Sequence, residues 1–251
     1  MTTETTPVSS QRGPELLGQI VVVIGGSSGI GLETARRARA EGADVILTGR
    51  HPERLEQPTR ELGALRAEAF DATDPDALAR FFDSLRTPID HVMVTAGDPP
   101  YGRLLEVSPE KRGLLTGRLE LPLDVARAAA GKVRPPGSLI FMGSTGHGRP
   151  RIGEGIISTV STATPTMIAG LALELAPVRV NLVAPGFVDT RLSASLLGDD
   201  LDARREQLRA TLPIGRVVGP ADVAALAVHL MINTAVTGAT YAIDGGQQFV
   251  E

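Results

Sequence analysis

The stretch IVVVIGGSSGIG, residues 20–31, decides the fold that this sequence predicts. Its first five residues are an unbroken apolar run, which is typical of a strand buried on both faces of a parallel sheet. The glycines that follow let the backbone turn tightly and approach a pyrophosphate, and a helix that begins there presents free N–H groups. We therefore predict a nucleotide site at the end of this strand. The alternative is a glycine-rich turn that serves packing alone.

The rest of the chain alternates short apolar runs with longer amphipathic stretches. The further predicted strands are residues 44–48, 64–69, 91–95, 138–142, 179–183 and 240–243. The predicted helices are residues 30–41, 52–62, 75–85, 109–133, 155–175 and 220–231. This alternation predicts a single α/β domain: a doubly wound (Rossmann) parallel sheet of about seven strands with helices on both faces. Ligands of such sheets bind beyond the carboxyl ends of the strands.

Composition excludes several classes of function. The 251 residues carry 25 Lys+Arg and 29 Asp+Glu, a net charge of −4, which argues against a nucleic-acid partner. The chain has no cysteine and four isolated histidines, so we expect neither a disulfide nor a metal site. No apolar stretch reads as a membrane span. We predict a flexible tail over residues 1–14, a domain over 15–251 and a cytoplasmic protein without a signal peptide.

Beyond the glycine turn, the sequence resembles the short-chain dehydrogenase/reductase family over residues 16–250. The phosphate loop of that family reads Thr-Gly-x-x-x-Gly-x-Gly, and residues 24–31 match it with Ile24 in place of the threonine. Further matches lie in order along the chain: Asp71, Ala96-Gly97, Ser144, Val180-Asn181-x-x-Ala184-Pro185-Gly186-x-Val188-x-Thr190, and Thr237-Gly238 with Asp244-Gly245-Gly246.

The resemblance implies a nicotinamide cofactor. The implied contacts come from Gly25, Ser27, Ser28, Gly29, Ile30, Gly31, Arg50, Asp71, Ala96, Gly97, Pro185, Gly186, Val188 and Thr190. An acid at the end of the second strand would hold the ribose 2′-OH of NAD, but glycine stands there and Arg50 follows. Arg50 suits a 2′-phosphate, so we predict NADP(H); a solvated loop cation is its alternative. The alternative for Asp71 is an acid at a helix N-terminus.

The catalytic residues of the family are only partly matched. Members use a Tyr-x-x-x-Lys pair as proton donor and cation, together with a serine and usually an asparagine. Ser144 fits the serine. By the spacing of the family the tyrosine falls at Ile157 and the lysine at Ser161, whether counted forward from Ser144 or back from residues 171–175. The chain contains two tyrosines, Tyr101 and Tyr241, and two lysines, Lys111 and Lys132, and none of these is near.

The asparagine positions are altered as well: one reads Thr95, and the other falls at Arg118 or Leu119. Isoleucine cannot transfer a proton, and loss of a positioned acid costs about 10²–10⁴-fold in rate. Two substitutes stand near the expected nicotinamide. His147 follows Ser144 on the same loop and titrates in a suitable range; Tyr101 follows the fourth strand. The alternatives are an exposed loop histidine and a rim aromatic.

Three functions remain open. The first is an NADP(H)-dependent oxidoreductase that acts on a small or medium-sized carbonyl or alcohol substrate with a non-standard proton donor. The second is a cofactor-binding or scaffold protein without catalysis, and the third is an isomerase or lyase on the same fold. Residues 190–216 read as two short helices that form a substrate lid. Residues 114–130 and 156–175 are apolar enough to pair with copies of themselves, so we predict a homodimer or homotetramer.

Overall fold

A seven-stranded sheet forms the centre of the computed structural model, which describes residues 13–97, 101–108, 113–146 and 151–250, apart from the side chains at 114 and 115. The strand order is β3-β2-β1-β4-β5-β6-β7, and every pairing is parallel. The strands are β1 (Ile20–Ile24), β2 (Asp44–Gly49), β3 (Arg66–Ala69), β4 (Ile89–Val94), β5 (Val133–Met142), β6 (Arg179–Pro185) and β7 (Thr240–Ile243). The predicted fold class, a single doubly wound parallel sheet, is confirmed.

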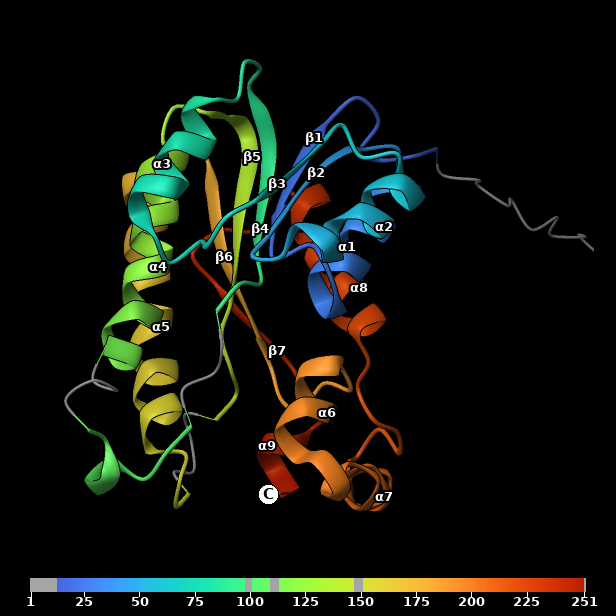
Figure 1. Ribbon diagram of the computed structural model, residues 1–251, viewed down its shortest axis with the longest axis vertical. Helices are drawn as coiled ribbons and strands as arrows, with labels where there is room; N and C mark the ends of the chain where they lie inside the picture. The colour runs from blue at the N-terminus through green and yellow to red at the C-terminus, as the bar shows by residue number, and fades with distance from the viewer. Residues whose placement is uncertain (1–12, 98–100, 109–112, 147–150, 251) are drawn as a thin grey trace, which may run out of the picture.

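Helices cover both faces of the sheet (Figure 1). One layer holds α1 (Gly29–Ala40), α2 (Pro52–Leu62) and α8 (Pro220–Ile232), and the other holds α3 (Pro75–Asp83), α4 (Gly113–Ala129) and α5 (Gly155–Glu174). Two hydrophobic cores result because successive residues of a strand point to opposite faces. In β1, Val22 and Ile24 join the core that contains Phe81, whereas Val21 and Val23 join the other.

The central strands end in register, which fixes the place of the site. Ile24 of β1 is paired with Thr48 of β2 and with Val94 of β4, and Val94 is paired with Phe141 of β5. The loops that follow these strands therefore leave the sheet at one edge. Below that edge in Figure 1 lie α6 (Arg191–Leu197), α7 (Leu201–Thr211) and α9 (Gln247–Val250).

One boundary differs clearly from the sequence-based expectation. The helix predicted over residues 109–133 ends at Ala129, and Val133 begins β5 instead, where it pairs with Ile89 of β4. Residues 109–112 lie outside the described part of the chain, as does the predicted tail up to residue 12. Within the described residues, α5 alone is long and apolar enough to span a membrane, and half of its apolar stretch is buried in the protein. Its apolar side packs on β6 and α4, as in the core helix of a globular domain.

Candidate functional site

The glycine loop between β1 and α1 is held tightly against its neighbours. The N–H groups of Gly25 and Gly26 donate to the carbonyl oxygen of Thr48 at 3.1 and 2.9 Å. Gly25 has a φ of +97°, which L side chains rarely adopt. A Cβ on either Gly25 or Gly31 would lie 2.6 Å from Oγ1 of Thr95. Only glycine fits at these two positions, because the turn packs directly against Thr95.

Thr95 fastens this loop, a role that sequence reasoning missed. Its Oγ1 lies 3.2 Å from the carbonyl oxygen of Ile24 and 3.1 Å from that of Gly25, and donates to them. Its backbone N–H donates to Ile24 at 2.8 Å, as that of Ala96 does at 3.1 Å. The signal in the sequence was a threonine at the exit of a strand that neighbours β1. The sequence shows that a threonine stands at an asparagine position of the family. Its contact with the glycine loop could be found only from the strand order, which places β4 next to β1.

The N-terminus of α1 points out of this loop. Ser28 is its N-cap, with extended backbone angles and no capping hydrogen bond from its side chain. The first N–H groups of a helix have no partner within the helix, and they carry the positive end of its dipole. Ser27, Ser28, Gly29 and Ile30 are partly exposed around this end. Such an arrangement can hold a phosphate or pyrophosphate.

Arg50 and Asp71 lie close together where β2 and β3 end. Asp71 accepts hydrogen bonds from the backbone N–H and the hydroxyl of Thr73 at 2.9 and 2.8 Å. These bonds lower the pKa of Asp71, and the nearby charge of Arg50 lowers it further. Gly49 faces the phosphate loop, since a Cβ there would lie 3.3 Å from Oγ of Ser27. The structure thus brings together a cation, an acid and the loop, in the space beside two strand ends.

Ser144 follows β5 at the same edge. It is partly buried, and its Oγ accepts a hydrogen bond of 3.1 Å from the N–H of Gly146. The N–H of the intervening Thr145 donates to Pro185 at 3.1 Å, which ties this loop to the end of β6. His147, predicted as a substitute acid, lies outside the described residues. Because the Oγ of Ser144 accepts the bond from Gly146, its own hydroxyl hydrogen can still be donated to a ligand oxygen.

Tyr101 lies at the rim of the site, with 53% of its surface exposed. The pKa of its phenol is raised by partial desolvation and by the nearby charge of Glu154, while Arg118 acts in the opposite direction. The next residue, Gly102, donates its N–H to the carbonyl of Gly153 at 2.7 Å. The loops after β4 and β5 are thus joined at the mouth. A raised pKa keeps the phenol protonated at neutral pH but makes it a weaker acid than a free tyrosine, so burial works against proton donation from it.

Ile157 and Ser161 lie one turn apart on α5, and both are buried. They line a small cavity of about 30 Å³ between α4, α5, β4 and β5. Arg118 of α4 lines the same cavity and reaches toward Gly97, where its Nη1 lies 3.2 Å from the place of a Cβ. Ser161 Oγ is buried and has no hydrogen-bond partner in the described part of the chain. Sequence reasoning named Arg118 only as an altered position, not as a cation inside the site.

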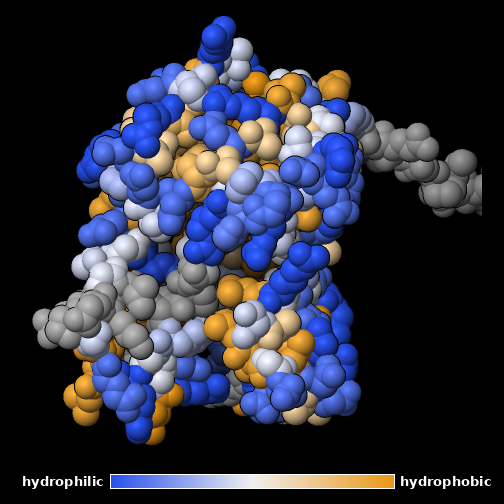
Figure 2. All heavy atoms as spheres, in the orientation of Figure 1, coloured by the Kyte–Doolittle hydropathy of each residue, from blue (hydrophilic) through white to orange (hydrophobic). Residues whose placement is uncertain are grey.

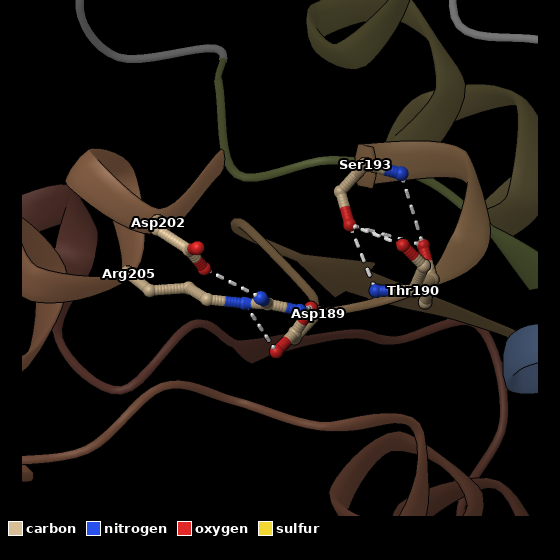
Figure 3. Close-up of polar contacts among 5 residues, drawn as sticks. All are labelled: Asp189, Thr190, Ser193, Asp202 and Arg205. Carbon is tan, nitrogen blue, oxygen red and sulfur yellow. Dashed lines mark hydrogen bonds and ion pairs between the residues drawn. The ribbon is translucent and has the colours of Figure 1, made fainter. Parts of the chain in front are cut away.

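The segment after β6 closes the site from below. A Cβ on Gly186 would lie 2.5 Å from Oε1 of Gln247, so the segment runs close to the C-terminal residues. Val188 forms a bridge with Val218. Thr190 caps α6 through reciprocal bonds with Ser193, and its methyl group lies 3.7 Å from the place of a Cβ on Gly29 (Figure 3). Of the predicted residues in this segment, Thr190 thus lies next to the glycine loop.

An arginine clamp holds α7 to this segment. Nε and Nη2 of Arg205 donate to both carboxylate oxygens of Asp189, at 2.9 and 2.7 Å, and Nη1 donates to Asp202 at 2.8 Å (Figure 3). The two predicted short helices are present as α6 and α7. Hydrophobic residues gather over the lobe that they form with α9 (Figure 2). An open hollow of about 460 Å³ separates this lobe from α1.

Comparison with known proteins agrees with this geometry. Residues 24–248 match the family model described as Enoyl-(Acyl carrier protein) reductase. The chain is 30% identical to the NADP-dependent (R)-specific alcohol dehydrogenase of Lentilactobacillus kefiri, over 92% of this chain and 97% of that protein.

Two solved structures are similar throughout. The first is a small-chain dehydrogenase in complex with NADPH, with a TM-score of 0.79 and 25% identity, over 92% of this chain and 99% of that one. The second is the MalC Reductase/Diels-Alderase of Malbranchea aurantiaca, with a TM-score of 0.86 and 25% identity, over 95% and 99%. On the strength of the family model and these relatives, the chain belongs to the short-chain dehydrogenase/reductase family.

Proposed function

We propose that this protein is an NADP(H)-dependent oxidoreductase that acts on a carbonyl or alcohol substrate with a non-standard proton donor. The observation that carries the proposal is the glycine cradle: a Cβ on Gly25 or Gly31 would collide with Thr95, and the N-terminus of α1 opens directly beyond. These residues fit a dinucleotide, because the tight turn is followed by a helix whose first N–H groups can donate to a pyrophosphate. NADP(H) would supply or accept the hydride.

The preference for NADP(H) is supported by the end of β2. Gly49 offers no carboxylate to a ribose 2′-OH, and Arg50 lies within electrostatic range of Asp71. A guanidinium at this place can make paired, charge-assisted bonds to a 2′-phosphate. The NADP-dependent relative and the NADPH complex are consistent with the same choice.

The chemistry proposed for the protein's own residues is limited to what they can do. Ser144 would donate its hydroxyl hydrogen to the substrate oxygen. Ile157 and Ser161 stand, by the spacing of the family, where its tyrosine and lysine would be, so α5 supplies no proton donor there. The protonated phenol of Tyr101 at the rim is our candidate donor among the described residues, and His147 is the second candidate.

One observation favours a second function, a cofactor-binding protein without redox turnover or a non-redox enzyme. The side chain of Ile157 is 8% exposed and borders the cavity, and no proton can come from it. The similar MalC is named both a reductase and a Diels-Alderase. The two functions differ in a simple experiment, because both require cofactor binding and only the first consumes NADPH.

The test is a titration followed by an assay. We expect NADPH to bind more tightly than NADH, followed by fluorescence of the reduced nicotinamide. A panel of aliphatic and aromatic ketones and aldehydes should then oxidise NADPH, at a rate that falls in Tyr101→Phe. Binding without turnover over the whole panel would support the second function. Failure of both cofactors to bind would refute both.

We also propose that the protein is a homodimer or homotetramer, paired through α4 and α5. Leu123 of α4 and Leu173 of α5 are exposed, the latter by 82%. In the layer that holds α3, α4 and α5, α5 is the most apolar helix. Pairing of these helices with copies of themselves would bury such side chains. Light scattering at micromolar concentration should give a multiple of 26.3 kDa. A monomer mass would contradict the proposal.

A further inference from the structure

The cavity between α4 and α5 has a distinctive lining. Its walls come mostly from apolar residues of β4, β5 and the two helices, and the polar side chains among them are Arg118, Ser161 and Thr164. None of its described lining residues is acidic. At about 30 Å³ it has room for about two oxygen-sized groups. The cavity is thus small and mostly apolar, and its lining includes the cation Arg118.

Arg118 brings its charge to the cofactor side of this cavity. Its Nη1 lies 3.2 Å from the place of a Cβ on Gly97, which follows β4 directly. Its charge also acts on the phenol of Tyr101 at the rim. The guanidinium therefore stands between the carboxyl end of β4, the cavity and the mouth of the site. A guanidinium presents several donors in a plane, which suits a carboxylate.

Ser161 offers a second donor from the opposite wall. A helical serine or threonine commonly donates to a carbonyl of the preceding turn, as Thr164 does to Val160 at 2.7 Å. Ser161 is 3% exposed, and its Oγ has no partner among the described residues. A buried hydroxyl without a partner costs free energy unless a ligand or water satisfies it. Its hydrogen is available to an oxygen in the cavity.

We propose that this cavity binds a carboxylate of the substrate, with Arg118 as its cation and the Ser161 hydroxyl as a second donor. The proposal rests on the proposed function and names its substrate class: a 2-oxo acid or the matching 2-hydroxy acid. Because Ile157 borders the same cavity, a carboxylate held here lies beside the position of the reacting carbonyl. Leu105 and Ile152 are exposed on the loops that the Gly102–Gly153 bond joins, and they offer apolar surface to the rest of such a substrate.

A matched pair of ketones tests this assignment. Phenylpyruvate and phenylacetone share an aromatic body and a ketone, and differ by a carboxylate in place of a methyl group. Each is titrated calorimetrically into the protein with and without NADP⁺, where no redox turnover can occur. We expect the unmodified protein to bind phenylpyruvate at least about 30-fold more tightly, as the loss of one partner of a buried charge pair implies.

Variants then assign the preference to residues. Arg118→Met should abolish it, and Arg118→Lys should keep part of it because the charge stays and the planar fork is lost. Arg103→Met is the charge control, since Arg103 pairs with Glu106 on the surface. Ser161→Ala should weaken phenylpyruvate binding by about 3- to 10-fold. Ser158→Ala is its control, a buried serine of the same helix that also lacks a partner within the described residues but does not line the cavity.

The outcomes separate this inference from the proposed function. An unmodified protein without carboxylate preference, or an Arg118→Met variant that keeps it, overturns the inference, whereas failure to bind NADP⁺ refutes the proposed function instead. Thermal melting shows whether Arg118→Met folds. Should it unfold, the comparison of Ser161→Ala with Ser158→Ala decides, and equal affinities in these two variants overturn the inference.

Discussion

Replacing Gly49 by aspartate should reverse the cofactor preference. Gly49 ends β2 with an ordinary φ, so a side chain is allowed there. Its Cβ would lie 3.3 Å from Oγ of Ser27 and 3.5 Å from Cδ2 of Leu55. Both contacts are with side-chain atoms, and Ser27 can rotate away. The new carboxylate would stand where the ribose 2′-OH of NADH can donate to it.

The magnitude follows from the charge of the new group. A hydrogen bond to a charged partner contributes about 1.5–3 kcal/mol, and the exposure of this region places it at the lower end. NADH should therefore bind about 10-fold more tightly in Gly49→Asp. The 2′-phosphate of NADPH would face a carboxylate of like charge, so NADPH should bind about 10-fold more weakly or worse.

Fluorescence titration of both reduced cofactors measures these changes. Arg50→Ala is the matched control: it should weaken NADPH by about 10-fold and leave NADH nearly unchanged, because it removes a phosphate partner and adds no carboxylate. The reasoning is wrong if Gly49→Asp leaves NADPH affinity unchanged. It is equally wrong if the unmodified protein already binds NADH more tightly than NADPH.

Three further predictions concern catalysis and stability. The double variant Ile157→Tyr with Ser161→Lys should reduce ketones with NADPH faster than the unmodified protein and faster than either single variant, and a double variant that is no faster would count against the family spacing of these positions. Arg179→Met should lower the free energy of unfolding by about 3–5 kcal/mol in urea titrations, since the buried guanidinium donates to five carbonyl groups, four around the end of α8 and one in β5; a loss below about 1 kcal/mol would contradict this. Burial, and then the charge of Arg179, lower the pKa of His91 from 6.5 to about 4. The unfolded chain therefore binds more protons, and stability should be full above pH 6.5 and fall by up to about 3 kcal/mol toward pH 4. His91→Gln should remove most of this slope above about pH 4.5, before carboxyl groups titrate, and an unchanged slope would refute the assignment.

The sequence predicts the fold well because the fold depends on local patterns. Uninterrupted apolar runs such as residues 20–24 require burial on both faces, and glycines directly after such a run allow few structures besides a ligand-binding turn. The one large error of boundary, the helix predicted to run to Val133, has a local cause. The sequence carries a helix-end signal that the prediction passed over, since Gly131 follows a run of alanines and has a φ of +73°. Pairing of Val133 with Ile89 then begins the strand.

The candidate site likewise combines features that the sequence predicts with contacts that only the tertiary structure shows. The sequence by itself determined the glycine turn after β1, the absence of a Tyr-x-x-x-Lys pair anywhere in the chain and the place of Ser144 after a strand. The tertiary structure alone decided that Thr95 fastens the glycine loop, and that Arg118 and Ser161 meet across one cavity. These contacts join residues from different elements, and their partners are set by strand order and helix packing. No spacing along the chain encodes them, because the distance between two side chains on neighbouring helices depends on how the helices pack.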